Sequence, residues 1–562
     1  MMGLATWRFV PTERWHLQVS AALLHELSGY SGLDRYGASN PYPDYYRYMP
    51  SYLANPTVAT SVQEAWEAGN RQITQIDWER LYEINRTAAD GAAVYALGSD
   101  RTDQLSFQLA ARFEARSRFG VKWQGGVRVR VERQGNYRRL EDLLGAAYVR
   151  DIDQFLIDDE YFGDQLQNDL NHPNRSVEPG EAYAYNYDLY HRYYGGWVRL
   201  ETDGPSGGFG NSRLKGAFTL QTAWRSYDRL GFYEKELFPG SASFGPSPQA
   251  TFTEYRLQGS LSYAFSAAHH LGLEVAYGDQ APVAQDLFLS VEDQNRLLED
   301  PHPENWLGGE LRYRWRGRWW DVSLTGYVTR RQGGVEVRSY YDDIEGAYAN
   351  AVLRGLDRLH VGAELGVLFT LTPRWSLRLV GAWTRSQYAQ DAWLDIYDDK
   401  SGEAIVEAER TYLKGYYIGG SPQQVASGEL RYGGRMWMAS LSVNWTGDHY
   451  VMLNPVRRTH WVCDKVWAPE IRAAFLEQER LGNATTLDLF VSKSFRIGQR
   501  GYLSLSVSVQ NLANRRTIIY SGYEPWRIAR SGSGIDRTFT PFDSRYLHAY
   551  GRTFYGTVNY RF

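Results

Sequence analysis

One long connection near the start of the chain carries six aromatic residues. Their type and spacing fit ligand binding better than those of any other group in the sequence. They are Tyr42, Tyr45, Tyr46, Tyr48, Tyr52 and Trp78. Aromatic rings hold an amphipathic ligand by stacking, and tyrosine hydroxyls add hydrogen bonds. The alternative is that the rings only pack the connection on itself. The candidate ligand-binding residues are Tyr42, Tyr45, Tyr46, Tyr48 and Trp78.

Acidic side chains gather in two later connections. The first group is Asp151, Asp153, Asp158, Asp159, Glu160 and Asp164, and the second is Asp395, Asp398 and Asp399. Oxygen-rich clusters bind Ca²⁺, but the spacing of an EF-hand loop is absent from both. Solvated acidic loops are the preferred interpretation, so the sequence predicts no metal site.

No group of residues predicts catalysis. His269 and His270 fall at an expected turn, without a helical His-x-x-x-His partner. The glycine-rich stretch 204–210 lacks the strand–helix context that cradles a phosphate. Cys463 is the only cysteine, which excludes an intrachain disulfide and a thiolate cluster. We therefore expect no enzyme and no cofactor. A net charge of -4 gives no indication of a nucleic-acid partner.

The last segment of the chain indicates which elements position these residues. Side chains alternate between the two faces of a strand. Counting back from the end, Phe562, Tyr560, Val558, Gly556 and Phe554 share one face, and polar residues occupy most of the other. A final strand that alternates in this way and ends on Phe is typical of a bacterial outer-membrane barrel. Phe554, Val558, Tyr560 and Phe562 are therefore the candidate barrel-assembly signal.

The same two-residue period recurs along the chain. In 503–510, for example, leucines and valines alternate with serines and a glutamine. Short turns, such as 372–374, alternate with long connections, such as 28–103, as in outer-membrane barrels. The mean hydropathy is -0.50, and no apolar run is long enough for a membrane-spanning helix. The pattern predicts an all-β transmembrane antiparallel barrel with about 17 strands: 5–11, 14–27, 104–116, 119–137, 184–203, 213–231, 249–267, 270–282, 304–316, 319–341, 348–371, 375–391, 415–434, 436–455, 483–497, 501–520 and 545–562.

Several segments, taken in order, resemble the C-terminal part of a TonB-dependent outer-membrane receptor of the Bacteroidetes type. The Asn-Pro-Tyr-Pro-Asp-Tyr-Tyr-Arg run at 40–47 is similar to a loop segment of those receptors, as are 75–85 and 167–175. The stretch 281–288, followed by Pro303-Glu304 and 309–311, resembles a pattern near the middle of the barrel. The run 509–515 resembles the Asn-Leu-x-Asn segment of the penultimate strand.

The resemblance implies a 22-stranded barrel filled by an N-terminal plug, with a TonB box before the plug. The sequence of 1–562 would then be a partial receptor barrel domain without the plug and the first five strands, and Met1 would lie in the middle of a longer protein. No export signal is recognisable around it. The implied function is uptake of a scarce nutrient across the outer membrane, energised through TonB. The implied partners are the TonB complex through the missing plug, the barrel-assembly machinery, the lipid bilayer and a surface lipoprotein, this last left open.

Two alternatives stay open at this point. An odd number of strands argues against, but does not remove, a plugless passive porin-like channel. A tyrosine-rich soluble carbohydrate-binding β-protein would also show alternating strands. The transported ligand is not indicated by the sequence.

Overall fold

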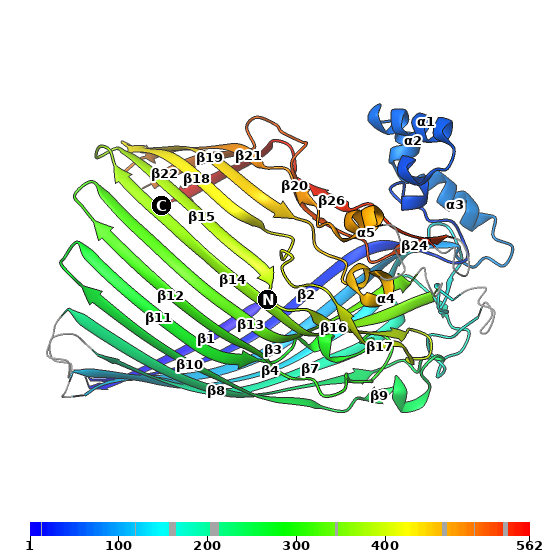
Figure 1. Ribbon diagram of the computed structural model, residues 1–562, viewed down its shortest axis with the longest axis horizontal. Helices are drawn as coiled ribbons and strands as arrows, with labels where there is room; N and C mark the ends of the chain where they lie inside the picture. Colours follow the sequence, from blue (N-terminus) through cyan, green and yellow to red (C-terminus); the bar gives the residue numbers. More distant parts are fainter. Residues whose placement is uncertain are drawn as a thin grey trace.

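Long antiparallel strands curl into a barrel in this computed structural model (Figure 1). The structure describes residues 1–12, 14–117, 120–156, 165–202, 213–342, 347–463, 469–499, 501–531 and 538–562. Seventeen strands in these ranges pair in chain order. They are β1 (Met2–Thr12), β2 (Trp15–Arg35), β3 (Tyr95–Arg116), β4 (Val121–Asp142), β7 (Ala182–Thr202), β8 (Leu214–Gly231), β10 (Ala250–Ala264), β11 (His269–Gln280), β12 (Glu304–Arg316), β13 (Trp320–Asp342), β14 (Ala347–Thr370), β15 (Trp375–Tyr388), β18 (Pro422–Gly434), β19 (Trp437–Tyr450), β21 (Ala484–Ile497), β22 (Gly501–Gln510) and β27 (Thr553–Arg561).

Shorter elements gather at the end of the barrel that carries the long connections, here called the loop end; the opposite end is the turn end (Figure 1). The short strands are β5 (Val149–Arg150), β6 (Ser176–Val177), β9 (Gly245–Pro246), β16 (Ala392–Asp398), β17 (Ala404–Thr411), β20 (Arg480–Leu481), β23 (Ile519–Tyr523), β24 (Ile528–Ser531), β25 (Thr538–Pro541) and β26 (Arg545–His548). The helices are α1 (Pro56–Glu67), α2 (Arg71–Thr74), α3 (Trp78–Arg86), α4 (His460–Cys463) and α5 (Pro469–Leu476), with 3₁₀ turns η1 (Tyr46–Tyr48), η2 (Pro50–Tyr52), η3 (Gly240–Ala242), η4 (Ala284–Leu287) and η5 (Val456–Arg458).

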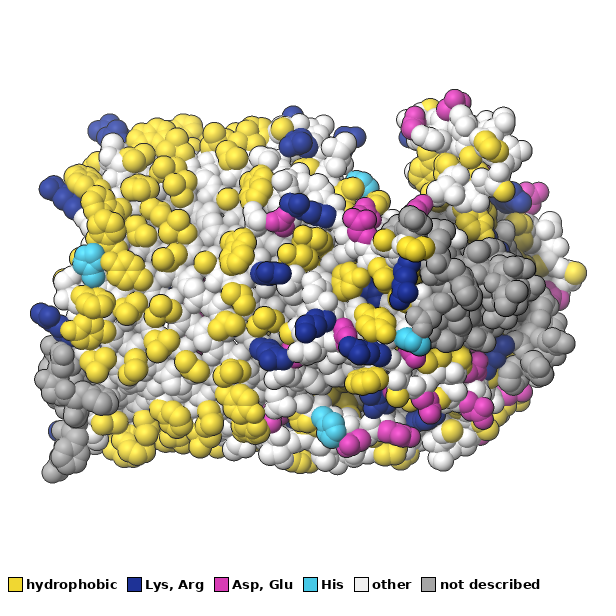
Figure 2. All heavy atoms as spheres, in the orientation of Figure 1, with side chains coloured by type: hydrophobic (Ala, Val, Ile, Leu, Met, Phe, Trp, Pro, Cys, Tyr) yellow, Lys and Arg dark blue, Asp and Glu magenta, His cyan; other side chains and the backbone are white. Residues whose placement is uncertain are grey.

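The outer face of the strands is apolar, as the alternation predicts. Figure 2 shows hydrophobic side chains gathered over the half of the barrel toward the turn end, with Lys and Arg at its rim. Solvent-exposed side chains of this face include Phe107, Leu109, Val127, Val198, Phe218, Leu220, Leu261, Leu273, Leu311, Leu324, Val328, Leu365, Leu379, Leu441, Val443, Leu505 and Val507. An outward apolar belt of this kind is what a barrel in a lipid bilayer requires. None of the helices in the described ranges is long and apolar enough to cross a membrane.

The inner face is polar and hydrogen-bonded between strands. Ser504 and Ser494 approach to 2.8 Å across β21 and β22, and the Ser506 hydroxyl donates to Ser492 at 2.9 Å. Asn444 donates its amide to the Asp488 carboxylate at 2.7 Å. These cross-strand pairs fix the register, because a slip of one residue would turn every side chain to the opposite face.

The strand positions are confirmed, but several predicted ends are wrong. The strand expected over 501–520 stops at Gln510, because Asn511 and Asn514 have positive φ angles of 49° and 53° and form a turn. The final strand, expected over 545–562, begins at Thr553. The connection expected over 28–103 is shorter, since β2 runs to Arg35 and β3 starts at Tyr95.

Three helices fill the first connection, which alternation alone did not predict. Their starts follow helix-capping rules. The Asn55 side chain accepts a hydrogen bond from the Thr57 amide at 3.0 Å, and Pro56 occupies the first turn of α1. The Asp77 carboxylate accepts from the Arg80 amide at 3.1 Å and caps α3. Figure 1 shows α1 and α2 projecting away from the barrel at the loop end.

The strands at the two ends of the sheet are each paired on one side. Within the described residues β1 pairs only with β2, and β27 only with β22. Phe554, Val558 and Tyr560 lie opposite Val509, Leu505 and Leu503, which places them on the outer face. Their exposed fractions are 70%, 75% and 52%, and that of Phe562 is 95%.

The buried core lies at the loop end, where the loops fold against the extended strands. Its largest cluster joins β14, β16, η5 and α5 through residues that include Leu353, Leu356, Leu394, Ile396, Val456 and Phe475. A buried ion pair between Arg458 and Glu524 (2.6 and 2.9 Å) ties the 451–463 segment to the last long connection. These contacts hold the loops in place around the mouth of the barrel.

Candidate ligand-binding site at the mouth of the barrel

Three of the five predicted aromatic residues meet at the loop end. The Tyr45 ring lies 4.7 Å from that of Tyr46 and 5.4 Å from that of Tyr48, in edge-to-face geometry. Tyr46 also contacts Tyr52 at 5.0 Å and Phe542, from the last long connection, at 5.1 Å. Ring pairs of this kind stabilise by about 0.5–1.5 kcal/mol beyond their buried area. We call Tyr45, Tyr46, Tyr48, Tyr52 and Phe542 the aromatic cluster.

An arginine completes the aromatic cluster. The Arg527 guanidinium lies 4.7 Å from the Tyr46 ring centroid, 5.4 Å from that of Phe542 and 4.8 Å from that of Tyr341 on β13. Cation–π contacts therefore link the first long connection, the last one and the β13–β14 hairpin. The rings contact other loops, so part of their role is structural.

The other two predicted residues lie outside the aromatic cluster. The Tyr42 hydroxyl accepts a hydrogen bond from the Leu33 amide at 2.8 Å, which ties the loop to the end of β2. Trp78 is the first residue of α3 and is 44% exposed. The structure thus separates the five candidates into three clustered residues, one that anchors the loop and one on a helix.

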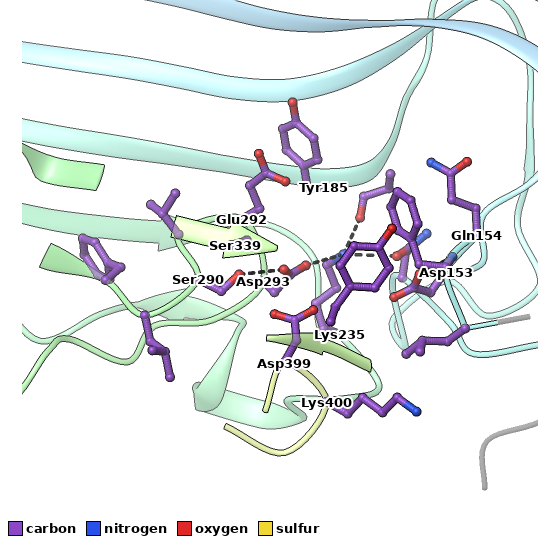
Figure 3. Close-up of a pocket in the computed structure, with 18 of the residues that line it drawn as sticks. Asp153, Gln154, Tyr185, Lys235, Ser290, Glu292, Asp293, Ser339, Asp399 and Lys400 are labelled. Carbon is purple, nitrogen blue, oxygen red and sulfur yellow. Dashed lines mark hydrogen bonds and ion pairs between the residues drawn. The ribbon is translucent and has the colours of Figure 1, made fainter. Parts of the chain in front are cut away.

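A cavity of about 380 Å³ opens inside the barrel mouth (Figure 3). Its walls come from β7, β13, β14, the β16–β17 hairpin and the long connections around 153, 235 and 290. The volume falls in the range of small-molecule sites. The polar residues labelled in Figure 3 are Asp153, Gln154, Tyr185, Lys235, Ser290, Glu292, Asp293, Ser339, Asp399 and Lys400.

Lys235 is buried in the wall of this cavity. Its ammonium donates to the Ala184 carbonyl at 2.6 Å and to the Asn168 side-chain oxygen at 3.1 Å. It also pairs with the Asp293 carboxylate at 3.1 Å, and Asp293 accepts a hydrogen bond from the Ser290 hydroxyl at 2.7 Å. Three oxygen partners satisfy the three donors of the ammonium group, so its burial is compensated.

Three further carboxyl groups face the same cavity. Desolvation by the surrounding protein, followed by the charge of Asp293, raises the pKa of Glu292 to about 7, although the residue as a whole is exposed to the open cavity. Burial and the same charge raise the pKa of Asp399 to about 6, although the Asn350 amide donates to it at 2.7 Å. Burial also raises the pKa of Asp153. Desolvation is the first cause in all three cases, and the charge of Asp293 adds to it for Glu292 and Asp399.

Aromatic contacts connect the cavity with the aromatic cluster. Tyr348, on β14, lines the cavity and contacts Phe155 at 5.2 Å between ring centroids. Tyr348 also meets Tyr341 at 5.3 Å, and Tyr341 packs on Arg527. Aromatic rings, bridged by the Arg527 guanidinium between Tyr46 and Tyr341, thus connect the predicted tyrosines with the cavity.

Sequence reasoning found only part of this site. Asp153 and Asp399 were assigned to two separate acidic loops, which the structure brings to one cavity. Asp158, Asp159, Glu160 and Asp164 lie outside the described residues. The cavity residues missed altogether include Tyr185, Lys235, Glu292, Asp293 and Tyr348. They come from four different connections or strands, and no local spacing in the sequence links them.

The comparisons with known proteins concern the fold. No protein-family model matches the chain, and neither does any curated protein. Among solved structures, the siderophore receptor PiuA from Acinetobacter baumannii is similar over 100% of this chain, with a TM-score of 0.55 and 12% identity, and 64% of that chain is covered. The ferric-catecholate import receptor Fiu from E. coli K12 is similar with a TM-score of 0.53 and 12% identity, over 100% of this chain and 63% of the Fiu chain. The copper transporter OprC is similar with a TM-score of 0.51 and 11% identity, over 97% of this chain and 62% of the OprC chain.

The chain therefore has the barrel fold of TonB-dependent outer-membrane receptors. It spans less than two thirds of the length of these solved structures. The predicted all-β transmembrane barrel is confirmed, and the soluble carbohydrate-binding alternative does not fit this fold.

Proposed function

We propose that this chain is the barrel part of an outer-membrane receptor that takes up a scarce nutrient with energy supplied through TonB. The observation that carries the proposal is a ligand-sized cavity built by the long loops of a receptor-type barrel. The outward apolar belt supports a place in the outer membrane. The loop end would then face the outside of the cell and the turn end the periplasm. The role is that of a transporter, not an enzyme.

We propose further that the complete protein contains strands and a plug beyond residues 1–562. The support is the single-sided pairing of β1 and β27 among the described residues. An unpaired strand edge leaves backbone donors and acceptors without partners, which is costly in lipid. The additional strands would pair with both edges and close the barrel. The plug would fill the lumen and make the contact with TonB.

The intact mass of the protein in the outer-membrane fraction of its source tests the second proposal. We expect a mass well above 64.4 kDa and a peptide that spans Met1. A mass near 64.4 kDa would contradict it and would favour a passive channel.

Nutrient-limited growth tests the proposed uptake. The gene is deleted in the source organism and the complete protein is restored, with TonB intact or inactivated. Under limitation of its nutrient, screened over iron, copper, cobalamin, peptide and glycan sources, we expect growth to need both the protein and TonB. Growth restored without TonB would overturn energised uptake, as would a deletion without effect on any of these sources.

A further inference from the structure

Carboxyl groups outnumber ammonium groups among the side chains that line the mouth cavity. Four carboxyl groups line it, those of Asp153, Glu292, Asp293 and Asp399, against the ammonium groups of Lys235 and Lys400. Lys235 is already held by Asp293 and two further oxygen atoms. In Figure 3 the Lys400 side chain runs along the lower edge of the view, away from Asp399. Among the lining side chains, carboxyl groups therefore outnumber cationic groups, while Arg138 and Arg229 act on Glu292 and Asp293 from outside the lining.

Glu292 is the carboxylate with the fewest partners. It lies next to Asp293 in the loop before β12, and Figure 3 shows its carboxyl group directed toward Tyr185, across the cavity from Asp399. Within the described residues no hydrogen bond or ion pair to its side chain is present, while its own backbone carbonyl accepts from Arg229 at 3.1 Å. The backbone is thus fixed and the carboxylate is left facing the cavity.

Asp153 and Asp399 add acceptor capacity on other walls. Asp153 uses one oxygen to accept from the Phe155 amide at 2.9 Å, and Asp399 uses one to accept from Asn350. A carboxylate accepts several hydrogen bonds, so both groups have acceptor sites left. Carboxylates on three connections can therefore surround one solute, rather than form one flat acidic patch.

The aromatic walls suit the same kind of solute. Tyr36, Phe155, Tyr185 and Tyr348 line the cavity beside these carboxylates. The face of an aromatic ring attracts a cation, and the attraction grows as water is excluded. The protein already binds a cation in this way at the loop end, where the Arg527 guanidinium lies between the rings of Tyr46 and Tyr341.

We propose that the mouth cavity binds a compact polar solute that carries ammonium or guanidinium groups. Glu292 and Asp399 would accept hydrogen bonds from its cationic groups, Asp153 would contact its far end, and Tyr348 would cover it. An anionic solute, such as a carboxylate-rich metal chelate, would meet like charge on the inner wall and is disfavoured. This inference deepens the proposed receptor function and rests on it for its biological role, whereas the binding itself concerns the barrel chain alone.

Isothermal titration calorimetry on the complete protein, purified in detergent from the outer membrane of its source, tests the inference, with heat-modifiable migration on gels as the check of folding. The probes are spermidine, a flexible polycation that the cavity volume admits, and citrate, an anion of similar size. We expect spermidine to bind and citrate to show no binding. Citrate binding as tightly as spermidine, or no spermidine binding by the folded protein, would overturn the proposal.

Variants locate the binding. Glu292→Gln combined with Asp399→Asn should weaken spermidine binding about tenfold or more, the scale of one or two lost hydrogen bonds to charged groups. Asp300→Asn is the matched control, because Asp300 is an exposed acid in the same connection, and its carboxylate pairs with the exposed His302 at 3.0 Å. It should leave the affinity unchanged. Equal effects of the two changes would mean that spermidine binds by general surface charge, and would overturn the site.

The outcomes separate this inference from the proposed function. If spermidine binds the cavity but growth does not depend on TonB, energised uptake fails and the cation site stands. If growth depends on both TonB and the protein but only an anion binds, the receptor function stands and the assigned solute class is wrong.

Discussion

The Arg527 guanidinium lies 4.7 Å from the ring centroid of Tyr46, so the last long connection of the barrel contacts the first. Tyr341 and Phe542 surround the same cation at 4.8 and 5.4 Å. Nearby, an Arg545 guanidinium nitrogen donates to the Asp44 carbonyl at 3.4 Å. The two connections belong to opposite ends of the sheet. Their contact therefore spans the loop end above the two singly paired strands.

Removing this cation should loosen the first connection. Arg527→Ala deletes three cation–π contacts, each worth about 0.5–1 kcal/mol where exposed. We expect residues 36–94 to be cleaved several-fold faster by trypsin or chymotrypsin in detergent, with the barrel itself intact by heat-modifiable migration. Arg552→Ala is the control, because Arg552 lies in the same last connection and is exposed. Equal cleavage rates in the two variants would show that Arg527 does not hold the loop.

The faces of the strands provide a second test. Val443 points outward on β19 and is 47% exposed, whereas the adjacent Ser442 points to the lumen. Val443→Arg places a charge in lipid, at a cost of about 2–4 kcal/mol near the bilayer midplane. Ser442→Arg is the matched change on the wet face and should cost much less. The yield of folded barrel in the outer membrane, or the urea midpoint after refolding into vesicles, measures the difference. Equal losses in both variants would contradict the assignment of the two faces.

The strands were predictable because their information is local. Ser504 and Leu505 are neighbours of opposite character, and a strand must place them on opposite faces, so the sequence alone assigns lumen and lipid there. The strand end at Gln510 coincides with the end of the alternation, since Asn511 falls on the apolar face and Leu512 on the polar face. The predicted strand over 501–520 therefore extended past the point where both the pattern and the backbone stop.

The cavity depends on contacts between connections that are far apart in the sequence. Glu292 and Asp399 line the same cavity only because the β11–β12 and β16–β17 connections fold toward each other. Hydrophobic packing of these loops on the extended strands sets that arrangement, and it leaves no periodic pattern. The tyrosines were conspicuous by composition, but their partners Arg527 and Phe542 come from the other end of the chain.

The end of the chain leads to a prediction about assembly. Phe562 is 95% exposed and follows a strand whose outer face carries Phe554, Val558 and Tyr560. If the barrel-assembly machinery recognises this face, Phe562→Asp should reduce the amount of heat-modifiable barrel in the outer membrane. Phe562→Tyr keeps the ring and should assemble normally. Unchanged barrel levels with aspartate at this position would show that the terminal ring is not part of the signal.

Cation binding at the mouth cavity should depend on pH in one direction. Desolvation and the charges of Asp293 and Asp100 raise the pKa of Glu292 to about 7. The charges of Lys235 and Arg138 lower this pKa, but by less. Burial and the charge of Asp293, with smaller contributions from Asp153 and Asp398, raise the pKa of Asp399 to about 6. The hydrogen bond from Asn350 lowers this pKa, but by less. Both groups are charged at pH 8 and mostly neutral at pH 5. The attraction for a cation is therefore present above pH 7 and is lost as the pH falls through 7 and 6.

Titration of spermidine into the folded protein between pH 8 and pH 5 measures this dependence, since the charge of spermidine changes little in that range. We expect the affinity to fall about tenfold or more toward pH 5, because two charge-assisted contacts are lost. In the variant that combines Glu292→Gln with Asp399→Asn, the affinity should be low and nearly constant with pH. A profile of the unaltered chain that is flat, or that rises toward acid, would remove these two carboxylates from the site. A sloping profile in the variant would assign the titration to other groups.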